Sequence, residues 1–489
     1  MTDDGAPAPA PRTPRLTPQA VATAAECPRR LWLNQQRPGG GTPPPEHILM
    51  LRERANAHER EVAARFANRH GPVWRREGSF ADAAAETLRL LRTTRDPIDQ
   101  PVFLSPDGRR SAAPDLVYWD GDRLVVLDAR LALRPDARSD FALQLAHARA
   151  VIRESAGLDP VRFEVVNGRG ETIVVRPAPE SEHAAALAAA EGVFARETEP
   201  DLLRGHSSCK PCQWYSHCWD LAQAERRIEV LPEVQSAHVP LWHALGVRTL
   251  DALASFDPAR APRDLPHGAA KRAIVAAAAW RDDRAVWLHP VRLPAWPVVW
   301  FDLEGDARGE DAEVPIYLWG FALDDGVNAS RGEAIVAGLE DGGDRAAWTR
   351  FVARATAILD AHPDVRWVHW DQYETLWIQR YTARHGAPAG FAERFTAACF
   401  DLKRVLDRCV RLPLRSYSIK HVARWTGFAW RDPDSGSEWS TARFHRACQT
   451  DDPAEREALL SGLVRYNEDD LFAMRAIWRW MLADQPHEP

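Results

Sequence analysis

Hydrophobic and polar residues recur along the chain with two different periods, which predict helices in some stretches and strands in others. Apolar residues three or four positions apart predict amphipathic helices in "TPQAVATAAECPRRLWLNQ", "HILMLRERANAHEREVAARF" and "DFALQLAHARAVIRES". Thr17 ahead of Pro18 is typical of a helix N-cap, and Ser181 is expected to cap a later helix. Short apolar runs separated by turn residues predict hairpins over 111–130 and 161–177.

The C-terminal part of the chain mixes strand-like and helix-like stretches. Strands are predicted in "PVVWFDLEGD", "VPIYLWGFAL", "GEAIVAG" and "RWVHW", and helices over 344–361 and at the C-terminal end. A mixed sheet flanked by helices is the layered arrangement that these elements favour. Residues 223–288 are helical and poor in strands. Two short helices around a glycine there are similar to helix-hairpin-helix modules, and a plain helical linker is an equally good interpretation.

A chain of 489 residues is too long for one ordinary core, so several domains are expected. The expected parts are a disordered tail (1–18), a first domain (19–222), a helical segment (223–288) and a last domain (289–489). The hydrophobic content of 45% and the charged content of 27% are typical of a soluble globular protein. The N-terminus lacks an apolar signal core, and no apolar run approaches the roughly 20 residues of a membrane span, so a cytoplasmic location is expected.

The formal net charge is −7, so a nucleic-acid-binding role would require local basic tracks. One such track is "RCVRLPLRSYSIKHVARW", in which basic residues that suit phosphates are interleaved with aromatic residues that stack on bases. The candidates for binding a nucleic-acid strand are Arg411, Arg415, Tyr417 and Lys420. The alternative is an ordinary pair of solvated helices.

Asp302 and Glu304 are the first candidates for chemistry. On a strand they point to the same face, where two carboxylates repel each other unless a cation or a proton intervenes. The alternative is a strand end that runs into solvent. Glu374 follows the strand "RWVHW" at the start of a helix, and Tyr466 and Asp470 share one helical face.

In this order the residues resemble the motifs of the DEDD exonucleases of the RNase H-like superfamily, in the subgroup that carries a tyrosine. Asp302 and Glu304 match D-x-E, and Tyr466 and Asp470 match Y-x-x-x-D. The family's N-x-x-x-[FY]-D is matched loosely by 369–374, where His replaces Asn and Glu replaces Asp. "WFDLEGD", "HWDQYE", "SYSIKHVARWTGF" and "YNEDD" are similar to the YprB-type RNase H-like domain.

The resemblance implies metal-dependent hydrolysis of phosphodiester bonds, in the 3′ to 5′ direction. Two Mg²⁺ or Mn²⁺ ions would stabilise the attacking and the leaving oxygen. The acids implied as their ligands are Asp302, Glu304, Glu374 and Asp470. Tyr466 would orient the attacking water, and Asp371 competes with Glu374 for the second motif. The implied partner is nucleic acid, with single-stranded DNA favoured.

Cysteines indicate a second kind of site. Cys209, Cys212 and Cys218 are regularly spaced and supply three thiolates, whereas a tetrahedral or cubane site needs four. Cys27 is the candidate for the fourth. This combination over residues 19–220 resembles the RecB-like nucleases that carry a [4Fe–4S] cluster. Zinc is the alternative, completed by His206 or His217.

RecB-like nucleases also carry a PD-(D/E)xK centre, which "PDLVYWDGDRLVVLDAR" resembles through Asp115, Asp128 and Arg130. His58 fits the family's upstream histidine, which is a metal ligand, and Gln144 fits the following glutamine, which contacts nucleic acid. Arg130 stands where the family has lysine, and its planar, bulkier cation is not equivalent. The centre is therefore either active or a degenerate DNA-binding platform.

The sequence thus predicts an α/β protein with two nuclease folds: a restriction-endonuclease-like, RecB-type domain and an RNase H-like mixed-sheet domain. It resembles a family of stand-alone RecB-like nucleases, which implies a metal-dependent exonuclease and a helicase, defence or repair partner. Two alternatives stay open. The chemistry could reside in the first domain, or both centres could be degenerate in an iron–sulfur DNA-binding adaptor.

Overall fold

The computed structural model describes residues 15–486 apart from 45, 72, 76–77, 133, 135–138, 203–208, 210–211, 262, 267, 307–313, 329, 339–341 and 434. The chain divides into two compact units, Met1–Arg204 with Cys209–Asp220, and Leu221–Pro489 with 205–208. The segment 223–288, expected as a separate linker, falls within the second unit. In the part of the chain described, no helix is both long and apolar enough to cross a membrane.

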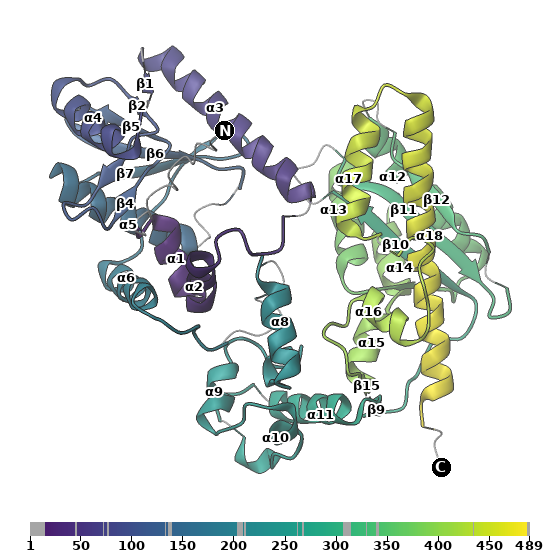
Figure 1. Ribbon diagram of the computed structural model, residues 1–489. Coiled ribbons are helices and arrows are strands. Elements are labelled where there is room, and N and C mark those ends of the chain that lie inside the picture. The colour runs from purple at the N-terminus through teal and green to yellow at the C-terminus, as the bar shows by residue number, and fades with distance from the viewer. Residues whose placement is uncertain are drawn as a thin grey trace, which may run out of the picture. The chain divides into compact units, whose positions relative to one another are not determined.

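A six-stranded sheet forms the centre of the first unit, in the order β1-β2-β5-β6-β7-β8 (Figure 1). Its strands are β1 (Trp74–Arg75), β2 (Ile98–Asp99), β5 (Leu116–Asp120), β6 (Arg123–Ala129), β7 (Arg162–Val166) and β8 (Thr172–Val174), and a separate pair is β3 (Phe103–Leu104) and β4 (Ser111–Ala112). The helices are α1 (Pro18–Glu26), α2 (Pro28–Gln36), α3 (Glu46–His70), α4 (Phe80–Thr93), α5 (Ser139–Ala156) and α6 (Glu180–Phe194). The antiparallel pairs β5–β6 and β7–β8 confirm both predicted hairpins.

One predicted helix start is confirmed and one is wrong. The Thr17 side chain accepts a hydrogen bond from the backbone N–H of Ala20, and Pro18 is the first residue of α1, as predicted. The other helix, α6, begins at Glu180 rather than after a Ser181 cap. Pro179 precedes it with a φ of −55°, a value that the proline ring fixes and that allows the helix to begin at the next residue.

The buried His147 ties the start of the chain to the first unit. Residues 1–14 of the predicted tail lie outside the described part, but Leu16 is buried and pairs with Arg110. His147 on α5 has its Nε2 3.2 Å from the carbonyl oxygen of Leu16 and its Nδ1 3.2 Å from His183 Nε2. Burial, assisted by the charge of His183, lowers the pKa of His147 to about 4, so the imidazole is neutral at pH 7.

The second unit contains a five-stranded mixed sheet in the order β12-β11-β10-β13-β14. Its strands are β10 (Val298–Gly305), β11 (Ile316–Asp324), β12 (Glu333–Val336), β13 (Arg366–His369) and β14 (Cys399–Asp401). The helices are α12 (Gly343–Ala361), α13 (Tyr373–His385), α14 (Phe391–Ala398), α15 (Leu402–Cys409), α16 (Ile419–Trp425), α17 (Ser437–Gln449) and α18 (Pro453–Asp484). β10 pairs antiparallel with β11 and parallel with β13, which confirms the predicted mixed sheet.

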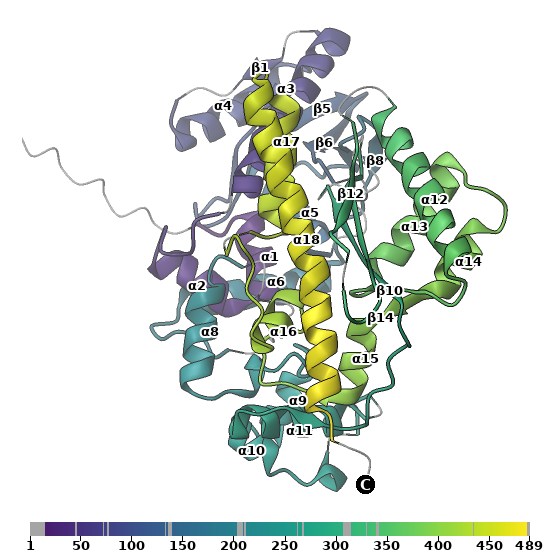
Figure 2. The same ribbon diagram turned by 90° about the vertical axis from the view of Figure 1, so that its right-hand side faces the viewer.

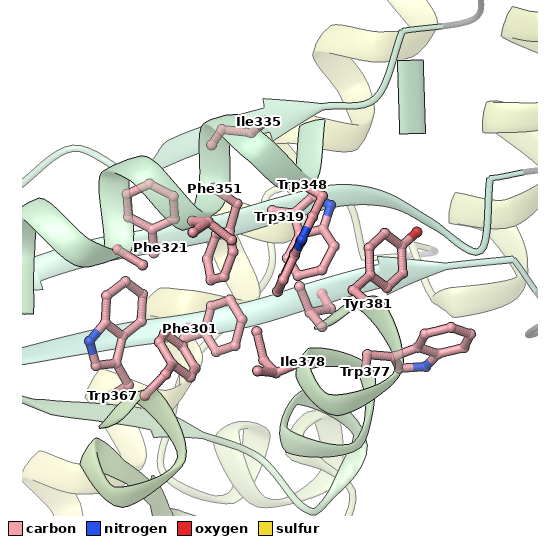
Figure 3. Close-up of a cluster of buried hydrophobic side chains, with 14 of the residues drawn as sticks. Phe301, Trp319, Phe321, Ile335, Trp348, Phe351, Trp367, Trp377, Ile378 and Tyr381 are labelled. Atoms are coloured by element: carbon pink, nitrogen blue, oxygen red, sulfur yellow. The ribbon is translucent and has the colours of Figure 1, made fainter. Parts of the chain in front are cut away.

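Alternation along β10 builds two separate apolar cores. Val299, Phe301 and Leu303 face α12–α14, whereas Val298 and Trp300 face α15, α16 and α18. Figure 2 shows α12–α14 on one side of the sheet and α16 and α18 on the other. The first core is rich in aromatic rings, which crowd around Phe301 in Figure 3. A strand buried on both faces is held rigidly in place, which fixes the residues at its end.

The long helix α18 is fastened to the rest of the second unit along its length. Arg475 Nε donates to Asp324 Oδ2 at 2.6 Å, and Asp324, at the end of β11, is fully buried. At its C-terminal end, Asp484 accepts a hydrogen bond from the indole of Trp287 at 3.2 Å. Trp287 belongs to the short strand β9 (Val286–Trp287). The position of α18 is therefore defined both by the five-stranded sheet and by the segment 223–288, which contains β9.

The helical segment packs onto the sheet-containing part through a buried ion pair. α8 (Tyr215–Ala224) begins in the first unit and ends within this segment. The further elements of the segment are η2 (Ile228–Val230), α9 (Val239–Ala244), α10 (Leu250–Ala254), η3 (Pro258–Arg260) and α11 (Ala269–Asp282). α9 and α10 flank Gly246, whose φ of 76° suits glycine, so the two predicted short helices are confirmed. Glu233 lies 3.4 Å from the buried Arg411 of β15 (Val410–Arg411).

We expect His147 to make the first unit less stable as the pH falls. Because its folded pKa of about 4 lies below the unfolded value, the unfolded chain binds more protons between these values. Stability should fall from about pH 7 to about pH 4, by as much as about 3 kcal/mol from this group. Calorimetry of wild type and His147→Gln across this range measures the effect. The loss should shrink in His147→Gln and persist in His289→Gln, which changes an exposed histidine, and an unchanged slope in His147→Gln would contradict the prediction.

Candidate functional site

Three acids from distant parts of the sequence meet at the end of β10. Val298 and Trp300 point from this strand into the core against α18, and Asp302 and Glu304 continue the same row. Helix α18 brings Asp470 to the same place. One carboxylate oxygen from each of the three acids lies within 4.8 Å of the others. The expectation of convergent acids therefore agrees with the geometry, and the alternative of a strand end in solvent does not.

Burial and mutual repulsion raise the pKa of these acids. The pKa values of Asp302 and Glu304 lie well above their ordinary range, first because burial removes water and then because Asp470 is close. Burial raises the pKa of Asp470 to about 6, against the opposing effects of a 2.7 Å hydrogen bond from Trp430 and the charge of Lys420. Like charges this close are tolerated only with a compensating cation or proton.

The donor set suits a divalent cation. Carboxylate oxygens are hard ligands, which Mg²⁺ and Mn²⁺ prefer. An isolated buried carboxylate is costly, and three of them side by side gain strongly when a cation replaces their lost water. Asp302, Glu304 and Asp470 are therefore a donor set that could hold Mg²⁺ or Mn²⁺.

The other acids near Asp470 have a different role. Arg431 pairs with Asp469 at 2.7 Å and with Glu468 at 2.8 Å. The single positive charge of Arg431 thereby offsets part of their negative charge, while Asp470 on the same helix turns towards the carboxylate group. In the acidic run "YNEDD", Glu468 and Asp469 therefore pair with Arg431, and Asp470 alone joins the carboxylate group.

The second motif places Glu374, rather than Asp371, on the buried side. Glu374 is 3% exposed, and its charge adds to the rise in the pKa of Asp302. Its Oε2 lies 3.4 Å from Nδ1 of His369. Burial opposes protonation of His369, but the hydrogen bond and charge of Glu374 outweigh it and raise the pKa of His369. Asp371 instead forms an exposed ion pair with Lys403 at 3.0 Å.

Tyr466 and Lys420 form one wall of the site. Tyr466 is 6% exposed, and its hydroxyl hydrogen bonds with Asp470. The ammonium of Lys420 lies 4.9 Å from the ring centroid of Tyr466 and 5.5 Å from that of Trp430, and it donates to the carbonyl of Ser435. Lys420, predicted as a strand-binding residue, is therefore at the carboxylate group itself.

Three residues at the site were missed by the sequence reasoning. Tyr373 is 39% exposed, and its hydroxyl occupies the space where a Cβ on Gly305 would lie. It stands at the aromatic position of the second motif, which was a usable signal. Ser440 on α17 hydrogen bonds with Glu304, and Asn467 on α18 donates to Asp302. Ser440 lies far from Glu304 in sequence and had no such signal.

The predicted strand-binding residues separate into exposed and buried ones. Arg411 is 4% exposed and is held by Glu233 and by the carbonyl oxygens of Asp407 and Val410, so it is not available to phosphates. The hydroxyl of Tyr417 bonds to the backbone of Leu412, and its ring packs against the second core. These two predictions are corrected, because both side chains are used inside the fold. Arg415 remains exposed.

The two acids of the first unit lie side by side, as predicted: Asp128 is in β6, and Asp115 directly precedes the neighbouring strand β5. Asp115 accepts from the backbone N–H of Ala129 at 2.8 Å, and Asp128 accepts from the backbone N–H of Asp115 at 3.0 Å. Burial raises the pKa of Asp115 to about 7, assisted by Glu59, and raises that of Asp128 to about 6, assisted by the charge of Asp115. Glu59, Asp99 and Asp115 line one small cavity.

The other residues of this centre differ in part from prediction. His58 has its Nε2 3.0 Å from the carbonyl oxygen of Val166, and its neighbour Glu59 faces Asp115 instead. The expected role of His58 as a metal ligand stays a prediction, and Glu59 joins Asp115 as a further acid of this centre. Arg130 stays near Asp128, at 3.7 Å, and lies over the ring of Phe141. Gln144 is half-buried on α5.

Three of the four predicted cluster cysteines influence one another. Burial raises the pKa of Cys218 to about 11; Arg29 opposes this rise, and the charges of Cys27 and Cys212 add to it. The sulfur of Cys27 accepts from the backbone N–H of Arg30 at 3.4 Å, and that of Cys212 from the N–H of Trp214 at 3.5 Å. Of the alternative zinc ligands, His217 contacts Glu199 at 3.2 Å, and His206 lies outside the described residues.

Comparison with known families defines the class of the second unit. A model of the RNase H superfamily, RNase_H_2, matches residues 299–482. The matched range begins within β10 and ends within α18, so it contains every residue of the carboxylate group. No curated protein matches the chain. The chain therefore contains a C-terminal RNase H-like domain, which supports a nuclease-type function.

We expect neutralisation of one acid to stabilise the cation-free protein and to remove its response to metal. Asp302→Asn keeps the shape and can still accept the hydrogen bond from Asn467, but it removes a repelling charge. In EDTA the second unit should gain about 1 kcal/mol, or about 2–4 °C in Tm. Mn²⁺ should raise the Tm of wild type and not that of Asp302→Asn.

Asp344→Asn is the matched control for this experiment. Asp344 is also buried, but it is partnered by the hydroxyl of Tyr381 and by His385 at 2.7 Å. Its neutralisation should lower the Tm in EDTA and preserve the response to Mn²⁺. A lower Tm for Asp302→Asn in EDTA, together with a retained Mn²⁺ response, would show that the three acids do not form a metal site.

Proposed function

We propose that the C-terminal unit is a metal-dependent exonuclease that hydrolyses nucleic-acid phosphodiester bonds in the 3′ to 5′ direction. The observation that carries the proposal is the meeting of Asp302, Glu304 and Asp470 within 4.8 Å, in a domain that matches the RNase H superfamily. Acids brought together from both ends of the matched range, and buried at a cost, indicate a use for their charge.

The residues of the site have distinct parts in this proposal. Asp302, Glu304 and Asp470 would hold the divalent cations, and Glu374, oriented by His369, would complete the set. When bound, such cations stabilise the negative charge that develops during phosphodiester hydrolysis. Tyr466 orients the attacking water while its hydroxyl stays bonded to Asp470.

Substrate contacts would come from the groups beside the acids. The ammonium of Lys420 carries positive charge towards the scissile phosphate, and the exposed Arg415 continues this charge along the strand. Tyr373 presents an exposed ring on which a base can stack. A single strand, whose bases are free to stack, suits this arrangement better than a duplex, so we favour single-stranded DNA.

The first unit gives a second candidate centre. Burial raises the pKa of Asp115 and of Asp128, and Glu59 hydrogen bonds with Asp115, so the three form a further group of acids like that of the PD-(D/E)xK nucleases that the sequence resembles. The position of Arg130 beside Asp128 leaves a cation where the family has lysine. We propose a RecB-type domain in which Cys27, Cys209, Cys212 and Cys218 hold a [4Fe–4S] cluster.

Loss of the acids of the second unit should abolish hydrolysis. With 5′-labelled single-stranded DNA and Mg²⁺ or Mn²⁺, the wild type should give a ladder of products that shorten from the 3′ end. Asp302→Asn should reduce the rate by about 100-fold or more. A 3′-label should be released at once as mononucleotide, and RNA of the same sequence tests the choice of nucleic acid.

Matched variants of the first unit separate the alternatives. Asp115→Asn combined with Asp128→Asn should leave the ladder unchanged. Loss of cleavage in this pair, with cleavage retained in Asp302→Asn, would place the chemistry in the first unit. Binding of DNA without hydrolysis in either metal would contradict the proposal and favour the adaptor.

We expect anaerobically purified protein to be brown, with broad absorption near about 400 nm from the cluster. Cys212→Ala should remove the colour, whereas Cys448→Ala, which changes an exposed cysteine of the second unit, should not. Metal analysis accompanies the spectrum. Colourless protein with one equivalent of zinc would contradict the cluster.

A further inference from the structure

Asn467 lies directly behind the acids of β10. It is 1% exposed on α18, between Tyr466 and the acids that follow it. Its Nδ2 donates to Asp302 Oδ2 at 2.7 Å and lies 3.5 Å from the carbonyl oxygen of Asp302. The same side chain hydrogen bonds with Glu304 and opposes the rise in the pKa of that acid. One amide therefore serves both acids of the first motif.

The orientation of this amide follows from the chemistry of its partners. The NH₂ group of Asn467 faces Asp302, which as an ionised cation ligand can only accept hydrogen bonds. The Oδ1 atom then faces β11, where Gly320 pairs with Asp302 across the sheet. A Cβ placed on Gly320 would lie 1.6 Å from this Oδ1 and 2.6 Å from its carbon. Glycine is required at this position by the neighbouring amide.

We propose that Asn467 is a positioning residue that fixes Asp302 and Glu304 for cation binding, and that Gly320 provides the space it needs. The inference rests on the proposed metal-dependent function. A hydrogen bond to Oδ2 of Asp302 holds that oxygen against the helix and leaves Oδ1 for a ligand. Without the donor, Asp302 would lose the contact that opposes its repulsion by Glu304 and Asp470, and it would turn away.

Mn²⁺ binding to the full-length protein, without nucleic acid, tests this role. Isothermal titration and the electron paramagnetic resonance signal of free Mn²⁺ both give a dissociation constant that does not depend on activity. Asn467→Ala and Gly320→Ala should each raise this constant by about 10–100-fold, as expected for partners that orient a metal ligand. Gly320→Ala displaces the Asn467 amide, whereas Asn467→Ala removes it. Both variants therefore take the hydrogen-bond donor away from Asp302.

A same-helix control separates positioning from packing. Gly462→Ala adds a methyl group to α18 in ordinary contact with Arg443 and Trp439, at 3.6 Å and 3.8 Å. It should leave Mn²⁺ binding unchanged. Calorimetry in EDTA reports the folded state of every variant, and Asn467→Ser replaces Asn467→Ala if the latter does not fold.

The outcomes distinguish failure of the positioning role of Asn467 from failure of the proposed metal-dependent function. Weaker Mn²⁺ binding by folded Asn467→Ala and Gly320→Ala supports positioning. If both variants lose only Tm and bind Mn²⁺ as tightly as wild type, Asn467 is a packing residue and the inference is wrong, while the proposed function stands. If the wild type binds no Mn²⁺, the proposed function fails, and the inference fails with it.

Discussion

Electrostatic repulsion among buried carboxylates is the constraint on which the second unit depends. Glu304 and Asp470 are buried and Asp302 is half-buried, so the three acids have little access to water, because β10 is covered on both faces and α18 packs across its end. The surrounding groups reduce the repulsion without removing it. The indole N–H of Trp430 donates to Asp470, and Lys420 adds one positive charge. The fold thus places three acids close together at a site where a bound cation would remove their repulsion.

Much of this could be predicted from local sequence pattern. The alternation along "PVVWFDLEGD" determines that Asp302 and Glu304 share a face, and the helical spacing of Tyr466 and Asp470 does the same for α18. The mixed sheet followed from the order of strands and helices. Resemblance to a known set of motifs then linked stretches that are far apart in sequence, and the RNase H superfamily match supports that link.

The predictions that failed depended on contacts which local pattern does not contain. The local sequence predicts that Arg411 is an exposed basic residue. In the structure it is buried beside Glu233, which lies almost 180 residues earlier in the chain. On a helix, a step of one residue turns the side chain by about 100°, so the sequence did not show that Glu59, the neighbour of His58, faces Asp115. The same limit concealed Ser440, whose helix is brought to β10 only by tertiary packing.

Helix α18 connects the site to a distant part of the second unit. The same helix that carries Asp470 ends at Asp484, which is bonded to Trp287 about 20 Å further along the axis. Trp287 lies near the C-terminal end of the segment 223–288. The position of Asp470 relative to β10 therefore depends on where that segment holds the C-terminal end of α18. A change in the length of the segment would shift α18 along its axis and move Asp470 relative to Asp302 and Glu304.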